Sequence, residues 1–139
     1  MGTEHEATVR ELLAAMEGEQ WDAARIDRML SLMAPDARYH VYAWEEPHVG
    51  QDAIRAEWLR QAQRFRDVRE EIVTMGSFGS TVFAERIDAF TVGETRVALH
   101  IAGVFEVDSD GKIAVWRDYG DREEVAVQLG RGVPGGERG

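Results

Sequence analysis

The stretch STVFAERIDAFTVG, residues 80–93, sets the pattern for the C-terminal half of the chain. Its β-branched and aromatic residues stand between glycine-containing turns, which predicts a strand over residues 81–90. Similar runs before and after it predict further strands, at residues 70–75, 95–107 and 112–119. Because short turns join these runs, we expect the four strands to form an antiparallel meander.

The N-terminal part of the chain has helical periodicity instead. Apolar residues recur at helical spacing, which predicts three helices, at residues 5–17, 22–33 and 51–65. A β-rich run at 38–44 lies between the second and third helix, and a short helix is expected at 121–129. Helices followed by a meander predict an α+β fold, in which the helices pack on one face of a curved sheet. Such a sheet encloses a cone-shaped cavity, which suits a small apolar ligand.

Composition and charge limit the classes of protein that the chain can belong to. With 139 residues, 44% hydrophobic and 30% charged, we expect one domain over residues 1–130 and a flexible glycine-rich tail at 131–139. The net charge of −10 argues against nucleic acid or an anionic membrane as the main partner, because phosphate binding needs clustered Lys and Arg. The chain has no cysteine, which excludes disulfides and thiolate chemistry. Neither a signal-peptide pattern nor an apolar run of ~20 residues is present, so we expect a cytoplasmic protein.

Two charged residues interrupt the apolar strand near its centre. Arg86 and Asp88 are two positions apart, so their side chains point to the same face, with α-carbons about 6.5–7 Å apart. The opposite face carries Phe83 and Ile87, and we therefore expect this strand to be buried on both sides. Buried charges are retained when they are paired and hydrogen-bonded. The pair is thus either a structural salt bridge or part of a polar site.

A second aspartate follows in the segment WRDY, residues 116–119. Trp116 and Asp118 share a face, so if Trp116 points into the core, Asp118 opens into the same pocket as Arg86 and Asp88. Fully ionised, these three groups would carry a net charge of −1, which the site can relieve by holding a proton on one carboxyl group. Such an arrangement separates the two pKa values and gives one general acid and one general base. Two ordinary structural salt bridges are the alternative interpretation.

Three segments resemble the limonene-1,2-epoxide hydrolase family of the nuclear-transport-factor-2-like and SnoaL-like superfamily. They are AERIDAF, GVFEVDSDGKIAVWRDYGD and PDARYHVYAWEEPHVGQDAI, at residues 84–90, 103–121 and 35–54. The resemblance extends over roughly residues 5–130. It implies a cone in which a curved mixed sheet is wrapped by N-terminal helices around a deep apolar pocket. It also implies a homodimer built on the sheet face, and an enzyme that uses neither a cofactor nor a metal ion.

The resemblance further implies a reaction and a role for each polar residue. In this family an Asp–Arg–Asp triad adds water to a small, mostly apolar epoxide in one acid/base step, giving a vicinal diol. Carried over, Asp118 is the base that deprotonates the catalytic water, Asp88 is the acid that protonates the epoxide oxygen, and Arg86 positions both. Tyr39 matches a family tyrosine that helps to hold the water. Val41 stands where the family usually has an asparagine, the second partner of that water.

The pocket wall is expected from strand alternation and from the family pattern. The expected members are Leu30, Val41, Trp58, Phe90, Leu99, Ile101, Trp116 and Val125. His100 alternates with two of them and is expected on the outer side of the sheet. Single histidines without partners at ligand spacing do not form a metal site, so no metal is expected. The acidic pair Glu70–Glu71 is expected to be solvated.

Two other functions stay open on the sequence. One is a related acid/base enzyme with the same cone, either an epoxide-opening cyclase or a ketosteroid-isomerase-like enzyme. The other is a non-catalytic cone that binds a small molecule. Val41 favours both, because its side chain cannot hydrogen-bond a water. The complete set of Arg86, Asp88 and Asp118 favours the hydrolase.

Overall fold

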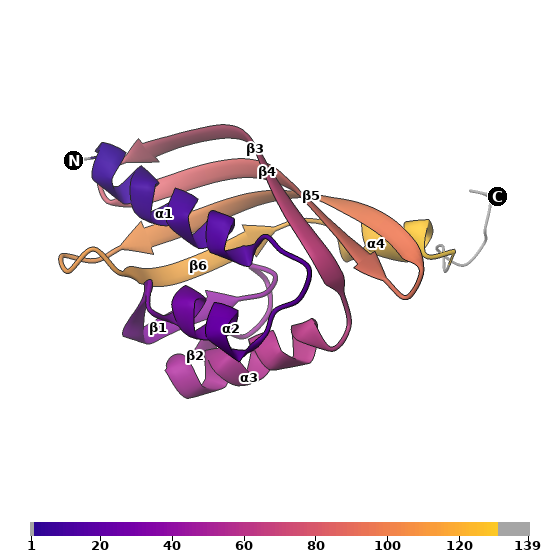
Figure 1. The fold of residues 1–139 in the computed structure, drawn as a ribbon. Coiled ribbons are helices and arrows are strands. Elements are labelled where there is room, and N and C mark those ends of the chain that lie inside the picture. The colour runs from indigo at the N-terminus through magenta and orange to yellow at the C-terminus, as the bar shows by residue number, and fades with distance from the viewer. Residues whose placement is uncertain (1, 131–139) are drawn as a thin grey trace.

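Helices pack on one face of a six-stranded sheet in the computed structural model, which describes residues 2–130 (Figure 1). The tail expected at 131–139 lies outside the described residues. No helix of the described chain is long and apolar enough to cross a membrane. In chain order the elements are α1 (Gly2–Met16), α2 (Ala23–Leu30), β1 (Met33–His40), β2 (His48–Val49), α3 (Gln51–Ala62), β3 (Arg66–Phe78), β4 (Thr81–Val92), β5 (Thr95–Val107), β6 (Ile113–Tyr119) and α4 (Arg122–Gln128).

The sheet is mixed, with the strand order β2-β1-β6-β5-β4-β3. Strands β3 to β6 form the predicted antiparallel meander. Strand β1 runs parallel to β6, and the short strand β2 pairs antiparallel with β1 at the edge of the sheet. The meander curves over the helices, and α4 lies at its far end, away from α2 and α3 (Figure 1). The predicted α+β fold with helices against a curved mixed sheet is confirmed.

The second helix ends earlier than its periodicity predicts. Asp22 caps α2, and its Oδ1 accepts the backbone N–H of Arg25 at 2.9 Å. The helix ends at Leu30 rather than at residue 33, and Met33 already begins β1. Pro35 explains the difference, because the residue before a proline disfavours helical backbone angles and the chain becomes extended. Strand β1 therefore starts earlier than expected.

A β-bulge in β3 decides which of its side chains face the helices. Close to the turn at 79–80, β3 and β4 pair as a regular hairpin, which if continued would put Glu71 opposite Asp88. The register shifts at Val73, and Glu70 takes that place instead. A shift of one residue moves all later side chains of a strand to the other face. The bulge therefore turns Glu70 toward the helices and Glu71 toward solvent.

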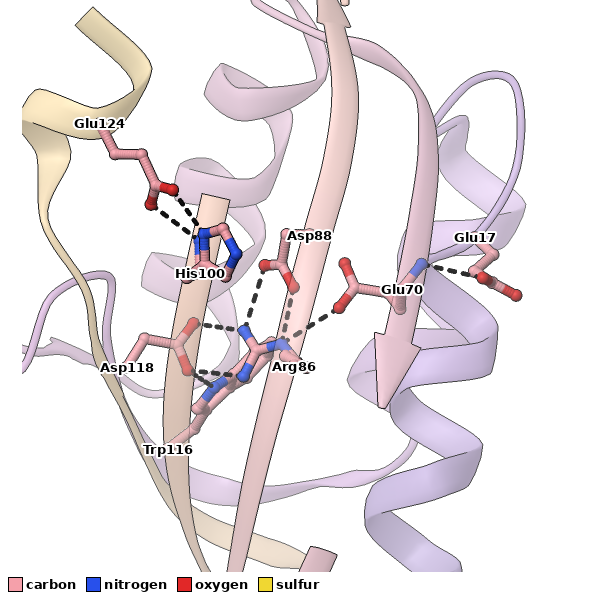
Figure 2. Close-up of polar contacts among 8 residues, drawn as sticks. All are labelled: Glu17, Glu70, Arg86, Asp88, His100, Trp116, Asp118 and Glu124. Atoms are coloured by element: carbon pink, nitrogen blue, oxygen red, sulfur yellow. Dashed lines mark hydrogen bonds and ion pairs between the residues drawn. The ribbon is translucent and has the colours of Figure 1, made fainter. Parts of the chain in front are cut away.

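The outer face of the sheet is exposed in the single chain. On β4, Ala84 and Arg86 point to the helices and are each 1% exposed, whereas Phe83 on the other face is 48% exposed. The prediction that this strand is buried on both sides is therefore wrong for the isolated chain. His100 lies on the outer face as expected, where its ring nitrogen pairs with the carboxylate of Glu124 in α4 (Figure 2).

The core between the sheet and the helices is rich in aromatic side chains. Tyr39, Phe105 and Trp58 surround Trp116, with ring centroids 4.8, 5.3 and 6.3 Å from it. All four residues are buried. Aromatic pairs at such distances add to the free energy gained from burial, so Tyr39 and Trp116 are held in fixed positions beside the polar residues of the sheet.

Candidate active site

A cavity of about 800 Å³ lies between the sheet and the helices. Its wall is mainly apolar, but four charged side chains meet on the sheet side, Glu70, Arg86, Asp88 and Asp118 (Figure 2). Cavities of roughly 300–1,000 Å³ with a few converging polar groups are typical of sites for small organic ligands.

Most residues that the sequence predicts for the pocket wall do line this cavity. They are Val41, Phe90, Leu99, Ile101, Trp116 and Val125. Leu30 and Trp58 lie elsewhere, because both are buried in the core behind the wall. Helical periodicity identifies the buried face of a helix, but it does not distinguish a core position from a cavity wall.

Arg86 is the centre of the polar group and donates hydrogen bonds to three carboxylates (Figure 2). Its Nε lies 2.8 Å from Asp88 Oδ1 and 3.1 Å from Glu70 Oε1. Its Nη1 and Nη2 lie 3.1 and 2.7 Å from the two carboxylate oxygens of Asp118. Burial disfavours the cation, but the carboxylates outweigh burial and raise the pKa of Arg86 well above its usual value. Arg86 therefore stays charged while its neighbours gain or lose protons.

Asp118 accepts hydrogen bonds from two directions. Both of its oxygens accept from Arg86, and Oδ1 also accepts the indole N–H of Trp116 at 2.7 Å. Burial raises the pKa of Asp118, although the hydrogen bonds from Arg86 and Trp116 oppose the shift by favouring the anion. A buried, well-held carboxylate of this kind is suited to accept a proton from a molecule in the cavity.

Glu70 belongs to this group, although the sequence predicts a solvated acidic pair. Its side chain is 2% exposed, against 15% for Asp88 and 9% for Asp118. Burial raises the pKa of Glu70 well above its usual range, and the charge of Asp88 and a hydrogen bond with it add to the shift. Its backbone N–H is held by Glu17 Oε2 at 2.8 Å. If all three carboxyl groups were ionised beside Arg86, the net charge would be −2 rather than −1.

Tyr39 lies on the other side of Trp116 and is held by the helix α3. Gln61 Nε2 donates to the phenol oxygen of Tyr39 at 3.2 Å and to Glu57 Oε2 at 2.9 Å. Burial and the charge of Asp118 raise the pKa of Tyr39, so it remains a phenol that can donate its hydrogen. Since the phenol oxygen accepts from Gln61, its hydroxyl hydrogen can be donated to a molecule in the cavity.

Gly103 on β5 makes room for the charged group. It lies opposite Ala84 of β4 and opposite Asp118 of β6. A Cβ atom at this position would lie 2.6 Å from Arg86 Nη1, 2.9 Å from a ring carbon of Phe105 and 3.0 Å from Asp118 Oδ1. These distances are shorter than ordinary contacts, so the guanidinium and the carboxylate can meet only beside a glycine.

A Gly103→Ala variant is therefore expected to lose stability and to disturb the Arg86–Asp118 contact. Overpacking of this kind costs roughly 1–3 kcal/mol, measured as the free energy of unfolding in denaturant. Gly76→Ala in β3 is the control, because a Cβ there meets nothing within 4 Å. Equal stability of the two variants would show that the packing around Gly103 can relax.

Comparison with known proteins identifies the family. A model of the limonene-1,2-epoxide hydrolase catalytic domain matches residues 3–131. The structure of an LEH-like epoxide hydrolase of Mycobacterium tuberculosis is 30% identical with a TM-score of 0.77, and the match covers 94% of this chain and 92% of that one. The chain belongs to the limonene-1,2-epoxide hydrolase family.

Other known proteins resemble this chain over part of its sequence or in the fold. Epoxide hydrolase EphG of M. tuberculosis is 41% identical over 75 residues, which are 54% of this chain and 50% of that protein. The match thus spans about half the length of that curated relative. A Catenulispora acidiphila protein with a ketosteroid isomerase-like fold, solved with trimethylamine, is 20% identical over 88% of this chain and 92% of that one, with a TM-score of 0.75. A nuclear-transport-factor-2-like protein of Burkholderia pseudomallei is 17% identical over 91% and 97%, also with a TM-score of 0.75. The last two show a common fold only.

Gln61 is the polar residue at Tyr39 that the sequence did not single out. Val41, for which the resemblance implies an asparagine in the family, lines the cavity with an apolar side chain. Gln61 also lines it and brings an amide to Tyr39 from α3. Its place on the buried side of the helix gives only a weak signal, because glutamine is common on helices for its propensity alone.

Proposed function

We propose that this chain hydrolyses a small, mostly apolar epoxide to a vicinal diol in one acid/base step. The proposal rests on one observation above all, that the guanidinium of Arg86 binds Asp88 and Asp118 together at the wall of a largely apolar cavity. Opening an epoxide with water requires one proton to leave the water and one to reach the epoxide oxygen. Two carboxyl groups held by one arginine can perform both transfers.

Asp118 is the base of the proposed reaction. Its carboxylate accepts a proton from a water, which then attacks one carbon of the epoxide. The phenol of Tyr39, whose pKa is raised by burial, donates a hydrogen bond to this water. Gln61 holds Tyr39 from behind and brings a second polar group to the same region, as a buried water needs two to four polar partners.

Asp88 is the acid of the proposed reaction. It is the most exposed of the three carboxyl groups, at 15%, and it lines the cavity. Its two oxygens accept from Arg86 Nε at 2.8 Å and Nη2 at 3.3 Å, which fixes the carboxyl group against the sheet. A proton on Asp88 can pass to the epoxide oxygen as the C–O bond breaks, so no free alkoxide forms in the apolar cavity.

The alternatives differ in the nucleophile. A cyclase would open an epoxide with a hydroxyl of the same substrate, an isomerase would consume no water, and a binding cone would leave the ligand unchanged. Val41 favours these alternatives, because it gives no hydrogen bond to a water. Gln61 weakens that argument, since it supplies an amide beside Tyr39.

A homodimer on the outer face of the sheet is part of the proposal. Val73, Phe83 and Tyr119 are 50%, 48% and 51% exposed on this face. Exposed apolar side chains that are grouped on one face are typical of a protein–protein contact. Light scattering of the purified protein tests this part, and a monomeric mass would contradict it.

Diol formation in ¹⁸O-labelled water is the experiment that tests the function. We expect purified protein to convert limonene oxide or cyclohexene oxide to a diol that carries one ¹⁸O atom. With enzyme in excess over substrate, the first turnover should already carry the label, because no enzyme carboxylate is esterified. Unlabelled diol in that first turnover would contradict the one-step reaction. Failure to turn over any member of a broad epoxide panel would contradict the function.

A further inference from the structure

Two carboxyl groups of the site face each other across adjacent strands. Glu70 of β3 lies directly opposite Asp88 of β4, on the face that lines the cavity. Side chains in such pairs have β-carbons about 4.5–5.5 Å apart, and like charges at this distance destabilise a sheet. The side chain of Glu70 is 2% exposed, so bulk water screens the repulsion only weakly. Two adjacent anions are therefore unfavourable here.

Arg86 does not donate enough hydrogen bonds to stabilise both Glu70 and Asp88 as anions. Its Nε carries a single hydrogen, which is shared between Asp88 Oδ1 at 2.8 Å and Glu70 Oε1 at 3.1 Å. Asp88 also accepts a hydrogen bond from Nη2. Glu70 accepts from Arg86 through the shared Nε hydrogen. One hydrogen of Nη1 and the other hydrogen of Nη2 are donated to Asp118. One more hydrogen is needed between Glu70 and Asp88, and a carboxyl proton supplies it.

We infer that Glu70 and Asp88 share one proton, and that Glu70 is a positioning residue that keeps the acid of the reaction supplied with it. The inference deepens the proposed hydrolysis. Its second part, that Glu70 keeps the acid supplied with a proton, rests on that proposed function. Asp88, at the cavity wall, gives the proton to the epoxide oxygen, and Glu70 acts through Asp88 without touching the substrate.

The proton count of the step is balanced. In the resting site the pair holds one proton and a charge of −1, Arg86 is +1 and Asp118 is −1. Asp118 removes a proton from water as the water oxygen bonds to carbon, while the C–O bond breaks and its electron pair takes the proton from Asp88. The pair is then −2 and Asp118 neutral, so the net charge stays −1. After the diol leaves, solvent returns the proton from Asp118 to the pair.

The other charged groups around Glu70 do not replace this proton. Glu17, the residue after α1, accepts a hydrogen bond from the backbone N–H of Glu70 and adds negative charge. Asp118 on β6 is a further anion that raises the pKa of Glu70. Arg64 and Glu57, beyond the sheet, line the same cavity and have opposite charges. Among the described residues, Arg86 is thus the cation that contacts Glu70 directly.

Thermal unfolding as a function of pH tests the shared proton without any substrate. A carboxyl group that stays protonated in the folded chain lowers stability as the pH rises from the unfolded-state pKa toward the raised folded value. Glu70→Gln removes that loss. The difference in melting temperature, variant minus unaltered protein, should therefore increase by about 4 °C or more as the pH is raised from about 5 to 8. Glu71→Gln, the neighbouring residue on the exposed face, is the matched control and should show no such trend.

The sign of this trend separates the inference from an ordinary salt bridge. If Glu70 were simply an ionised partner of Arg86 with a lowered pKa, its contribution to stability would already be complete above about pH 5, and the difference between Glu70→Gln and the unaltered protein would be flat from about pH 5 to pH 8. A flat or falling difference therefore overturns the shared proton, whether or not the protein turns over an epoxide.

The pH profile of kcat tests the catalytic half. In Glu70→Gln, the new amide can donate to Asp88 and stabilise it as an anion, so the alkaline limb of the profile should move about one pH unit or more toward acid. At neutral pH kcat should fall by about tenfold. An equal loss at every pH with both limbs unmoved would indicate a structural role only. If the melting-temperature difference rises with pH but no epoxide is turned over, the shared proton between Glu70 and Asp88 is supported and the proposed hydrolase function is contradicted.

Discussion

An Asp118→Asn variant is expected to form diol about 10²–10⁴-fold more slowly than the unaltered protein, because an amide cannot take a proton from water. The two side chains have nearly the same shape, and the amide stays within reach of Trp116 and Arg86, so the fold should survive. The measurement is kcat/KM on the epoxide that the unaltered protein converts best, with a thermal melt of each protein to check the fold.

The control for this variant is Asp110→Asn, the same chemical change in an exposed turn between β5 and β6. It is expected to leave diol formation unchanged. If Asp118→Asn kept more than about a tenth of the activity, the base would have to be another group. The same result in both variants would remove Asp118 from the mechanism.

The decrease of kcat at acid pH is expected to follow the protonation of Asp118. As the proposed base, Asp118 can accept a proton only when it is ionised, and burial raises its pKa, against the opposing effect of Arg86 and Trp116. As the pH falls, Asp118 therefore gains a proton before an ordinary aspartate would, and kcat should fall with it. The midpoint of this acid limb is expected above about pH 4, the usual range for Asp.

The three charges at the centre of the site are the part that alternation could predict. Arg86 and Asp88 are two positions apart on one strand, and Trp116 indicates the face on which Asp118 lies. In an antiparallel meander these strands are neighbours or next neighbours, so a common face brings the three side chains together. The period of two and the meander order of the strands are together sufficient for this prediction.

Glu70 could not be predicted in the same way, because its orientation depends on a bulge. Regular pairing from the turn at 79–80 would have placed Glu71 opposite Asp88, and the shift at Val73 reverses the two glutamates. Bulges depend on how a strand fits its partner and the layer below, and a single sequence carries little signal for them. Gln61 was missed for a related reason, since its contact with Tyr39 depends on how α3 is placed against β1.

Arg86→Met is expected to lower the free energy of unfolding by about 3–5 kcal/mol at neutral pH, the largest stability effect in the site. Methionine fills part of the volume but leaves three buried carboxyl groups without a cation. Denaturant unfolding measures the loss. Arg117→Met on the outer face of β6 is the control, because its 2.9 Å ion pair with Glu106 has side chains 28% and 45% exposed. An exposed pair of this kind contributes at most about 1 kcal/mol.

The pH dependence of the Arg86→Met variant distinguishes lost charge balance from lost packing. Without Arg86, burial and mutual repulsion raise the carboxyl pKa values above those of the unfolded chain, which lie near pH 4. The folded variant then binds more protons than the unfolded chain, so its stability is retained below about pH 4 and is lost as the pH rises through the raised values. We therefore expect the variant to gain stability when neutral solution is acidified, and to regain much of it at neutral pH when Glu70→Gln and Asp118→Asn are added. A loss that is the same at every pH, and that the added amides leave unaltered, would mean that Arg86 stabilises the fold by filling space rather than by balancing the three carboxyl groups.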